Sequence, residues 1–353
     1  MGKQRSIFAF FISLPLLVLA APTFAQQSNP QISIVQKWLG SGHADAESPS
    51  FTHWNNQEAI PGTCATCHSG QGFRDFYGVD GSTAGVIDHP IVPGGVVDCD
   101  TCHNDVMATP TAVTFPSGIT INAHGTVATC MTCHQGRQSG PALDAATQDM
   151  GDDTIDPGLS FINPHYAPAA AMQMGSAGGG GYQYPGLSYM TRFTHVRGLA
   201  QCIDCHDPHS LEIETQSCVR CHGTEDLRAI RTSQTDFDGD GHTDSGIYAE
   251  ISALSETLME AIGTYSVNII ESQIAYADQH PYFFYAEGHE NAGAAYASWT
   301  PRMLRAAYNY KFVTSDPGAY AHNPHYAIQL LHDSITDLAG AMGHYYEIGE
   351  RPI

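Results

Sequence analysis

All ten cysteines of this 353-residue chain fall into five copies of one pattern, Cys-x-x-Cys-His. Residues three apart lie on one side of a helical turn, so each copy presents two thiols together and a histidine just beyond them. The copies run over Cys64–His68, Cys99–His103, Cys130–His134, Cys202–His206 and Cys218–His222. The second cysteines are Cys67, Cys102, Cys133, Cys205 and Cys221. A chain that repeats this arrangement must fold around whatever those groups bind.

The first residues indicate export. Lys3 and Arg5 precede an apolar run from Ile7 to Ala21, and a small residue, Ala25, comes just before the polar start at Gln26. This pattern predicts a signal peptide over 1–25. The alternative, a retained membrane anchor, needs about 20 apolar residues, which is more than the run supplies. We expect a protein of the periplasm or the cell exterior with no membrane span after cleavage.

Export makes disulfides the default expectation for ten cysteines, but the spacing points elsewhere. Cys-x-x-Cys-His is the attachment signature of haem c, in which the thiols bond the porphyrin and the histidine binds the iron. A single copy could be a redox dithiol or half a zinc site, but five copies without a spare cysteine speak against both. The chain therefore resembles the multihaem c-type cytochromes. The resemblance implies five haem c groups, with proximal ligands His68, His103, His134, His206 and His222.

The motif spacing predicts the fold class. The motifs begin 35, 31, 72 and 16 residues apart, which leaves too little chain for a separate core around each. Closely packed haems must form much of the core over 26–230, and the haems of the last two motifs must be neighbours. Strand signals are sparse, with one short hairpin predicted near 113–121. We expect a mainly α fold with much irregular loop, few or no strands, and a helical C-terminal domain over 231–353.

Fourteen histidines lie outside the motifs and supply candidate sixth ligands for the irons. Six have a favourable context, such as neighbouring aromatic residues or closeness to a motif: His43, His53, His165, His195, His209 and His322. His209 follows His206 in a Cys-His-x-Pro-His arrangement that resembles many multihaem cytochromes, where the second histidine binds a neighbouring haem. If five irons are each bound by two histidines, at least one candidate is not a ligand.

The string Asn-Pro-His-Tyr-Ala occurs twice, at 163–167 and at 323–327. Asn caps helices and Pro favours their first turn, so both copies predict a histidine at a helix start.

Charge restricts the partners. The chain has 14 Lys and Arg against 36 Asp and Glu, for a net charge of −22. Nucleic-acid binding requires clustered basic residues, so no nucleic-acid partner is expected. A basic redox protein would suit this surface.

A calcium loop is predicted after the last motif. Four carboxylates and one backbone carbonyl occupy loop positions 1, 3, 5, 9 and 7: Asp236, Asp238, Asp240, Asp244 and His242. Position 12 is Ile247 and not the Glu of an EF-hand, although Glu250 lies nearby as a candidate substitute.

Three helices should follow the loop, because apolar residues recur at helical spacing over 251–269, after Thr300-Pro301 and after Asn323-Pro324. The segment 305–331 resembles the C-terminal helical part of the pentahaem nitrite reductase and hydroxylamine oxidoreductase superfamily. That resemblance implies that His322 binds a haem iron. The nitrite reductases attach their active haem through a motif that ends in Lys, whereas all five motifs here end in His, so the resemblance implies shared architecture and not shared chemistry.

The function that follows is respiratory electron transfer through haems bound by two histidines each. The partners would be redox proteins or an extracellular electron acceptor. Two alternatives stay open. One is an oxidoreductase in which one haem has an open site for a small nitrogen or sulfur compound. The other is a homo-oligomer or extracellular filament, in which the next chain donates a distal histidine.

Overall fold

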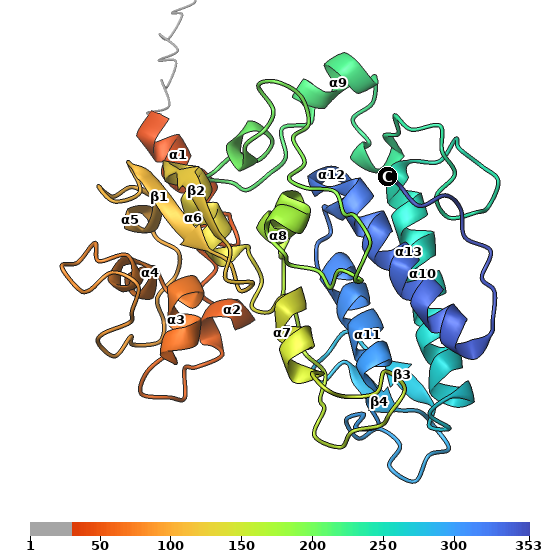
Figure 1. Cartoon of the computed structure of the whole chain (residues 1–353). Coiled ribbons are helices and arrows are strands. Elements are labelled where there is room, and N and C mark those ends of the chain that lie inside the picture. Colours follow the sequence, from red (N-terminus) through yellow and green to blue (C-terminus); the bar gives the residue numbers. More distant parts are fainter. Residues whose placement is uncertain (1–29) are drawn as a thin grey trace, which may run out of the picture.

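The computed structural model describes residues 30–353, so the predicted signal peptide over 1–25 lies outside the described residues. The described chain is mainly helical with long irregular loops, and its strands form two small antiparallel sheets. The fold class expected from the sequence is confirmed. In Figure 1 the N-terminal helices and hairpin lie on one side and the long C-terminal helices on the other, with α7 and α8 between them.

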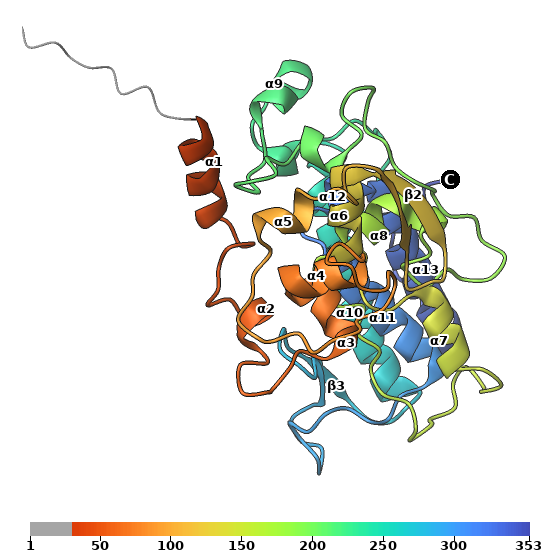
Figure 2. The same ribbon diagram turned by 90° about the vertical axis from the view of Figure 1, so that its left-hand side faces the viewer.

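The N-terminal side consists of short helices joined by loops. They are α1 (Pro30–Leu39), α2 (Pro49–Thr52), α3 (Gly62–His68), α4 (Gly70–Phe76), α5 (Cys99–Cys102) and α6 (Gly125–Cys133). The predicted hairpin is present as β1 (Pro110–Thr114) and β2 (Thr120–His124), with Val113 opposite Ile121. Figure 2 shows α1 and α9 (Gln216–His222) projecting from the body of the molecule.

Each cysteine motif lies on a helix or helical turn. The first three motifs lie on α3, α5 and α6, the fourth begins on the 3-10 turn η2 (Cys202–Asp204), and the fifth lies on α9. These helices are short because few of their side chains pack against protein. Ala65 is the one buried residue of α3, Thr101 is the one of α5, and α9 has none. The helix α6 differs, since it buries five side chains, including Val127 and Met131.

The three predicted C-terminal helices are present as α10 (Ile247–Asn268), α11 (Pro301–Thr314) and α13 (Pro324–Met342). Thr300 caps α11 by accepting a hydrogen bond from the Met303 N–H, and Asn323 caps α13 in the same way from the Tyr326 N–H. The three helices pack on one another around side chains such as Leu258, Tyr308 and Leu331, none of which is exposed. Burial of each such side chain contributes about 1.5–3 kcal/mol.

The remaining elements are short. They are α7 (Gly140–Ala146), α8 (Ala169–Met174), α12 (Ala319–His322), the 3-10 turns η1 (Gly175–Ala177) and η3 (Leu227–Ala229), and the strands β3 (Ile274–Tyr276) and β4 (Phe283–Tyr285). Among the described residues, no helix is both long enough and apolar enough to cross a membrane.

The repeated string Asn-Pro-His-Tyr-Ala folds in two ways, so one of the two predicted helix starts is wrong. At 323–327 it begins α13 as expected. At 163–167 the Asn163 carboxamide accepts a hydrogen bond from the His165 N–H, and His165 has a left-handed φ of 82°. That turn breaks helical geometry. It directs the His165 ring toward His68, and the next helix, α8, begins only at Ala169.

Candidate functional site

A cavity of 2750 Å³ lies among the cysteine motifs. Nine of the ten motif cysteines line it, and the tenth, Cys99, is exposed. Protein interiors are close-packed, and voids larger than a water molecule are few. A cavity of this size, with thiols and imidazoles in its wall, therefore fits several large flat groups that carry both thiol-reactive and nitrogen-binding centres. Haem c is such a group.

Each motif histidine faces a second histidine ring. The ring centres are 5.7–6.4 Å apart in five pairs, His68–His165, His103–His209, His134–His43, His206–His322 and His222–His195. A metal ion that binds two imidazoles in line, with metal–nitrogen bonds of about 2.0 Å, places the ring centres about 6 Å apart. All five pairs have the separation that an iron between two imidazoles requires.

His53 is the sixth candidate, and the structure places it differently. Its ring packs edge-on against Trp54 at 4.8 Å, and Trp54 in turn contacts His68 at 5.1 Å. Within the described chain, the five pairs use every motif histidine once and leave His53 without a motif partner.

Backbone carbonyls orient several of the paired rings. The Nδ1 atom of His68 lies 2.8 Å from the Ser50 carbonyl oxygen, and that of His134 lies 3.1 Å from the Ala167 carbonyl oxygen. The His206 Nδ1 has a longer contact of 3.4 Å with the Leu211 carbonyl oxygen. Donation from Nδ1 to a carbonyl fixes the tautomer that leaves Nε2 free to bind a metal.

Burial keeps two of the paired rings neutral. It lowers the pKa of His43 to about 4, and the facing His134 ring adds to the effect. Burial lowers the pKa of His165 to about 4 in the same way, with a further contribution from His68. Imidazole binds metals in its neutral form, so both rings are ready to bind at neutral pH.

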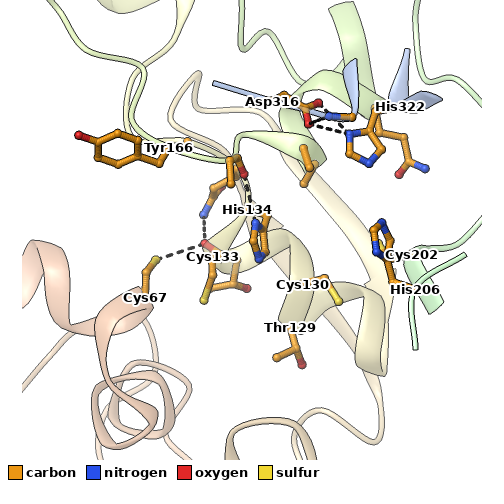
Figure 3. Close-up of a pocket in the computed structure, with 18 of the residues that line it drawn as sticks. Cys67, Thr129, Cys130, Cys133, His134, Tyr166, Cys202, His206, Asp316 and His322 are labelled. Atoms are coloured by element: carbon orange, nitrogen blue, oxygen red, sulfur yellow. Dashed lines mark hydrogen bonds and ion pairs between the residues drawn. The ribbon is translucent and has the colours of Figure 1, made fainter. Parts of the chain in front are cut away.

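Contacts between thiols connect the motifs in space. The Cys67 thiol contacts that of Cys133, which joins the first motif to the third. The Cys130 thiol contacts that of Cys202, which joins the third motif to the fourth. Figure 3 shows these residues around the third motif on α6.

Two further motifs lie near this group. Helix α5, which carries the second motif, packs against α6, so the second motif is close to the third. The Glu214 N–H, just before α9, donates a hydrogen bond to the Cys205 carbonyl at 2.9 Å, so the fifth motif is close to the fourth. The third motif, on α6, is therefore the meeting point of the arrangement.

The predicted calcium loop takes a different form from the one expected. The carboxylate oxygens of Asp236, Asp238 and Glu250 lie within 4.8 Å of one another. Asp240, Asp244 and the His242 side chain do not join this group. Burial, together with the neighbouring carboxylate of Glu250, raises the pKa of Asp238 to about 6. A cation would relieve this repulsion, but Arg231 already forms an ion pair with Glu250. Calcium binding stays a prediction.

Sequence reasoning missed the role of one residue beside the paired histidines, Asp316. Asp316 hydrogen-bonds to His322 and is almost fully buried. An aspartate six residues before a candidate ligand is too common a pattern to indicate this contact. Glu250, expected from the sequence as a substitute for the missing Glu at loop position 12, does lie with Asp236 and Asp238, on the first turn of α10.

Comparison of this chain with known proteins indicates the class of protein to which this arrangement corresponds. A family model described as "Cytochrome c7 and related cytochrome c" matches residues 49–135, which hold the first three motifs. The C-type polyheme cytochrome OmcC of Geobacter sulfurreducens is 26% identical over 397 residues, which cover 90% of this chain and 48% of OmcC. OmcB of the same species is 26% identical over 359 residues, which cover 82% of this chain and 46% of OmcB. The matches and the motifs together support a multihaem c-type cytochrome.

This chain spans about half the length of the curated relatives it matches. Among solved structures, the outer cell wall cytochrome OcwA is similar with a TM-score of 0.42 and 14% identity, over 86% of this chain and 50% of OcwA. The resemblance of 305–331 to the nitrite reductase and hydroxylamine oxidoreductase superfamily stays a prediction.

Proposed function

We propose that this chain carries electrons through five haem c groups, each attached to one Cys-x-x-Cys pair and each bound by two histidines. The proximal ligands are the five motif histidines, and the distal ligands are His43, His165, His195, His209 and His322. The observation that carries the proposal is the set of five ring pairs at 5.7–6.4 Å, which uses each motif histidine once.

Haem supplies one-electron chemistry at its iron, and the protein tunes that chemistry through ligands, hydrogen bonds and burial. Two facing imidazoles would together close a haem iron held between them to substrates. The carbonyls of Ser50 and Ala167 keep His68 and His134 oriented for binding. The residues of this chain therefore favour transfer of electrons over binding and transformation of a substrate.

The contacts between motifs support a branched order of haems that differs from their order in the sequence. The first, third, fourth and fifth sites form a chain, and the second joins it at the third. Cys99 of the second motif and Cys221 of the fifth are both exposed. The second and fifth sites are thus the places where a redox partner approaches most closely.

The two alternatives differ from this proposal in how many motif histidines have a facing histidine ring. An oxidoreductase with an open iron needs a motif histidine without a facing ring, and a filament with donated ligands needs the same. The described chain supplies a facing ring to each motif histidine, which favours the electron carrier. We further propose a periplasmic or extracellular location, with a redox protein or an extracellular acceptor as partner.

Ligand replacement in the mature protein tests the proposal. His43→Ala should convert one of five low-spin irons to high spin and allow it to bind carbon monoxide when reduced. His53→Ala is the matched control, since His53 lies in a similar aromatic setting before the first motif but has no facing motif histidine. It should leave all five irons low-spin. A high-spin iron in the control, or none in His43→Ala, would overturn the ligand assignment.

A further inference from the structure

Asp316 makes an unusual contact with His322. Its two carboxylate oxygens lie 2.7 and 2.9 Å from the His322 Nδ1 atom, and its side chain is 1% exposed. Figure 3 shows the carboxylate beside the imidazole, on the side of the cavity that holds His206. The ring donates an N–H to a buried carboxylate, which is a stronger hydrogen bond than one to a neutral acceptor.

Among the other nine paired histidines of the described chain, no imidazole ring has a hydrogen bond or ion pair with a carboxylate, and His209 meets Asp207 through its backbone N–H alone. His68, His134 and His206 have backbone carbonyls as Nδ1 partners instead. The fourth site therefore combines one ring that meets a neutral carbonyl, His206, with one that meets an anion, His322. This asymmetry sets the fourth site apart from the other four.

The backbone holds Asp316 in place. The carboxylate also accepts a hydrogen bond from the Gly318 N–H at 3.0 Å, within the turn between α11 and α12. Gly318 lies so close to the imidazole that a Cβ atom at this position would be only 2.6 Å from the His322 Cε1 atom. These contacts fix the positions of the Asp316 carboxylate and the His322 ring relative to each other.

We propose that Asp316 is a positioning residue that lowers the reduction potential of the haem held between His206 and His322. This inference rests on the proposed ligation by His322. A carboxylate that accepts the Nδ1 proton makes the imidazole a better electron donor, which favours ferric over ferrous iron. The buried negative charge acts in the same direction, because ferric haem carries one more positive charge than ferrous haem.

The position of the fourth site gives the lowered potential a consequence. This site lies between the third and the fifth, through the Cys130–Cys202 contact and the hydrogen bond from Glu214 to Cys205. An electron that moves between the third and fifth haems through the fourth meets a site where the Asp316 carboxylate makes ferrous iron less favourable. Asp316 thus raises the free-energy cost of electron transfer between the exposed fifth site and the other sites.

Potentiometric titration of the mature protein, followed by absorbance and by low-temperature EPR, tests the proposal. Asp316→Asn keeps the shape of the side chain and removes the charge. It should raise the potential of one haem so that its reduction equilibrium shifts at least tenfold, about 59 mV for one electron. The other four potentials and the five low-spin signals should be unchanged. Asp316→Glu should restore a low potential.

The control is Asp337→Asn on α13. It removes the same charge from the ion pair with Arg302 of α11, away from the paired histidines. It should move no single potential in this way. Unchanged potentials in Asp316→Asn would overturn the proposal. So would a high-spin iron in that variant, which would mean that Asp316 only holds the ring in place. Failure of the ligand assignment is distinguishable, because His322→Ala would then leave all five irons low-spin.

Discussion

Three of the motif helices, α3, α5 and α9, are stabilised by different means from the C-terminal helices of this chain. The helices α10, α11 and α13 bury 9, 10 and 11 side chains, whereas α3 and α5 bury one each and α9 buries none. Isolated helices of four to seven residues are unstable in water, so the motif helices need something other than their own side chains to pack against. The difference teaches that one part of the molecule has a protein core, while the other depends on the proposed haems to complete its packing.

The largest effect is expected when one haem attachment site is removed at a time. Cys130→Ala with Cys133→Ala empties the third site, at the meeting point of the motifs, and should prevent accumulation of folded protein. Cys218→Ala with Cys221→Ala empties the fifth site on α9, which buries no side chain, and should leave a folded protein with four haems. Mass spectrometry and circular dichroism of the exported proteins check both outcomes. Equal loss of fold in the two variants would contradict the distinction between the central and peripheral sites.

The protein core of the C-terminal side should respond to truncation in the usual way. Leu258→Ala on α10 removes a side chain with no exposure and should lower the free energy of unfolding by about 2–5 kcal/mol. Val267→Ala on the same helix is the control, because Val267 is 49% exposed and should change it by less than about 0.5 kcal/mol. Denaturant unfolding measures both. If Leu258→Ala were as mild as the control, α10 would not rest on a packed core.

A smaller effect is expected from substitution of Asn323, which connects α13 to α8 and to the loop before the fourth motif. Its buried side chain caps α13 and donates hydrogen bonds to the carbonyls of Thr191 and Gln173. Asn323→Ala should cost about 1–3 kcal/mol of unfolding free energy, since it leaves buried backbone groups without partners. Ser48→Ala, at the exposed cap of α2, is the matched control and should cost clearly less. Equal losses would mean that Asn323 acts only as a local cap.

The smallest expected effect concerns calcium at the start of α10. If Asp236, Asp238 and Glu250 bind the ion, calcium at ten times its Kd should add about 1.4 kcal/mol to the unfolding free energy. Asp236→Asn with Asp238→Asn should remove that gain, and a chelator should reverse it in the unaltered protein. Thermal melts with and without calcium measure the effect. A melting temperature that calcium does not move would show that the cluster is satisfied by Arg231 and the backbone alone.

Local features of this molecule could be predicted from the sequence, and long-range pairing could not. The motif spacing, the apolar periodicity of α10 and the caps at Thr300 and Asn323 act within a few residues, so the pattern reveals them. The partner of His134 is His43, far away in the chain, and only the fold brings the two rings together. The two copies of Asn-Pro-His-Tyr-Ala make the same point.

The second copy begins α13, but the first must bring His165 to His68, and this long-range demand overrides the local preference for a helix. Six candidate distal ligands could therefore be named, but His53 could not be separated from the other five. Its context, an aromatic segment before the first motif, resembles that of His43. Only the position of Trp54 between His53 and the first motif distinguishes the two.

The central claim is that all five irons are closed by two histidines. The most direct measurement is the EPR spectrum of the oxidised holoprotein, followed by the optical spectrum of the reduced protein before and after addition of carbon monoxide. The account predicts low-spin signals alone, equivalent to five irons, and no optical shift. A high-spin signal together with a carbon monoxide shift would contradict it, because an iron would then be open to a substrate.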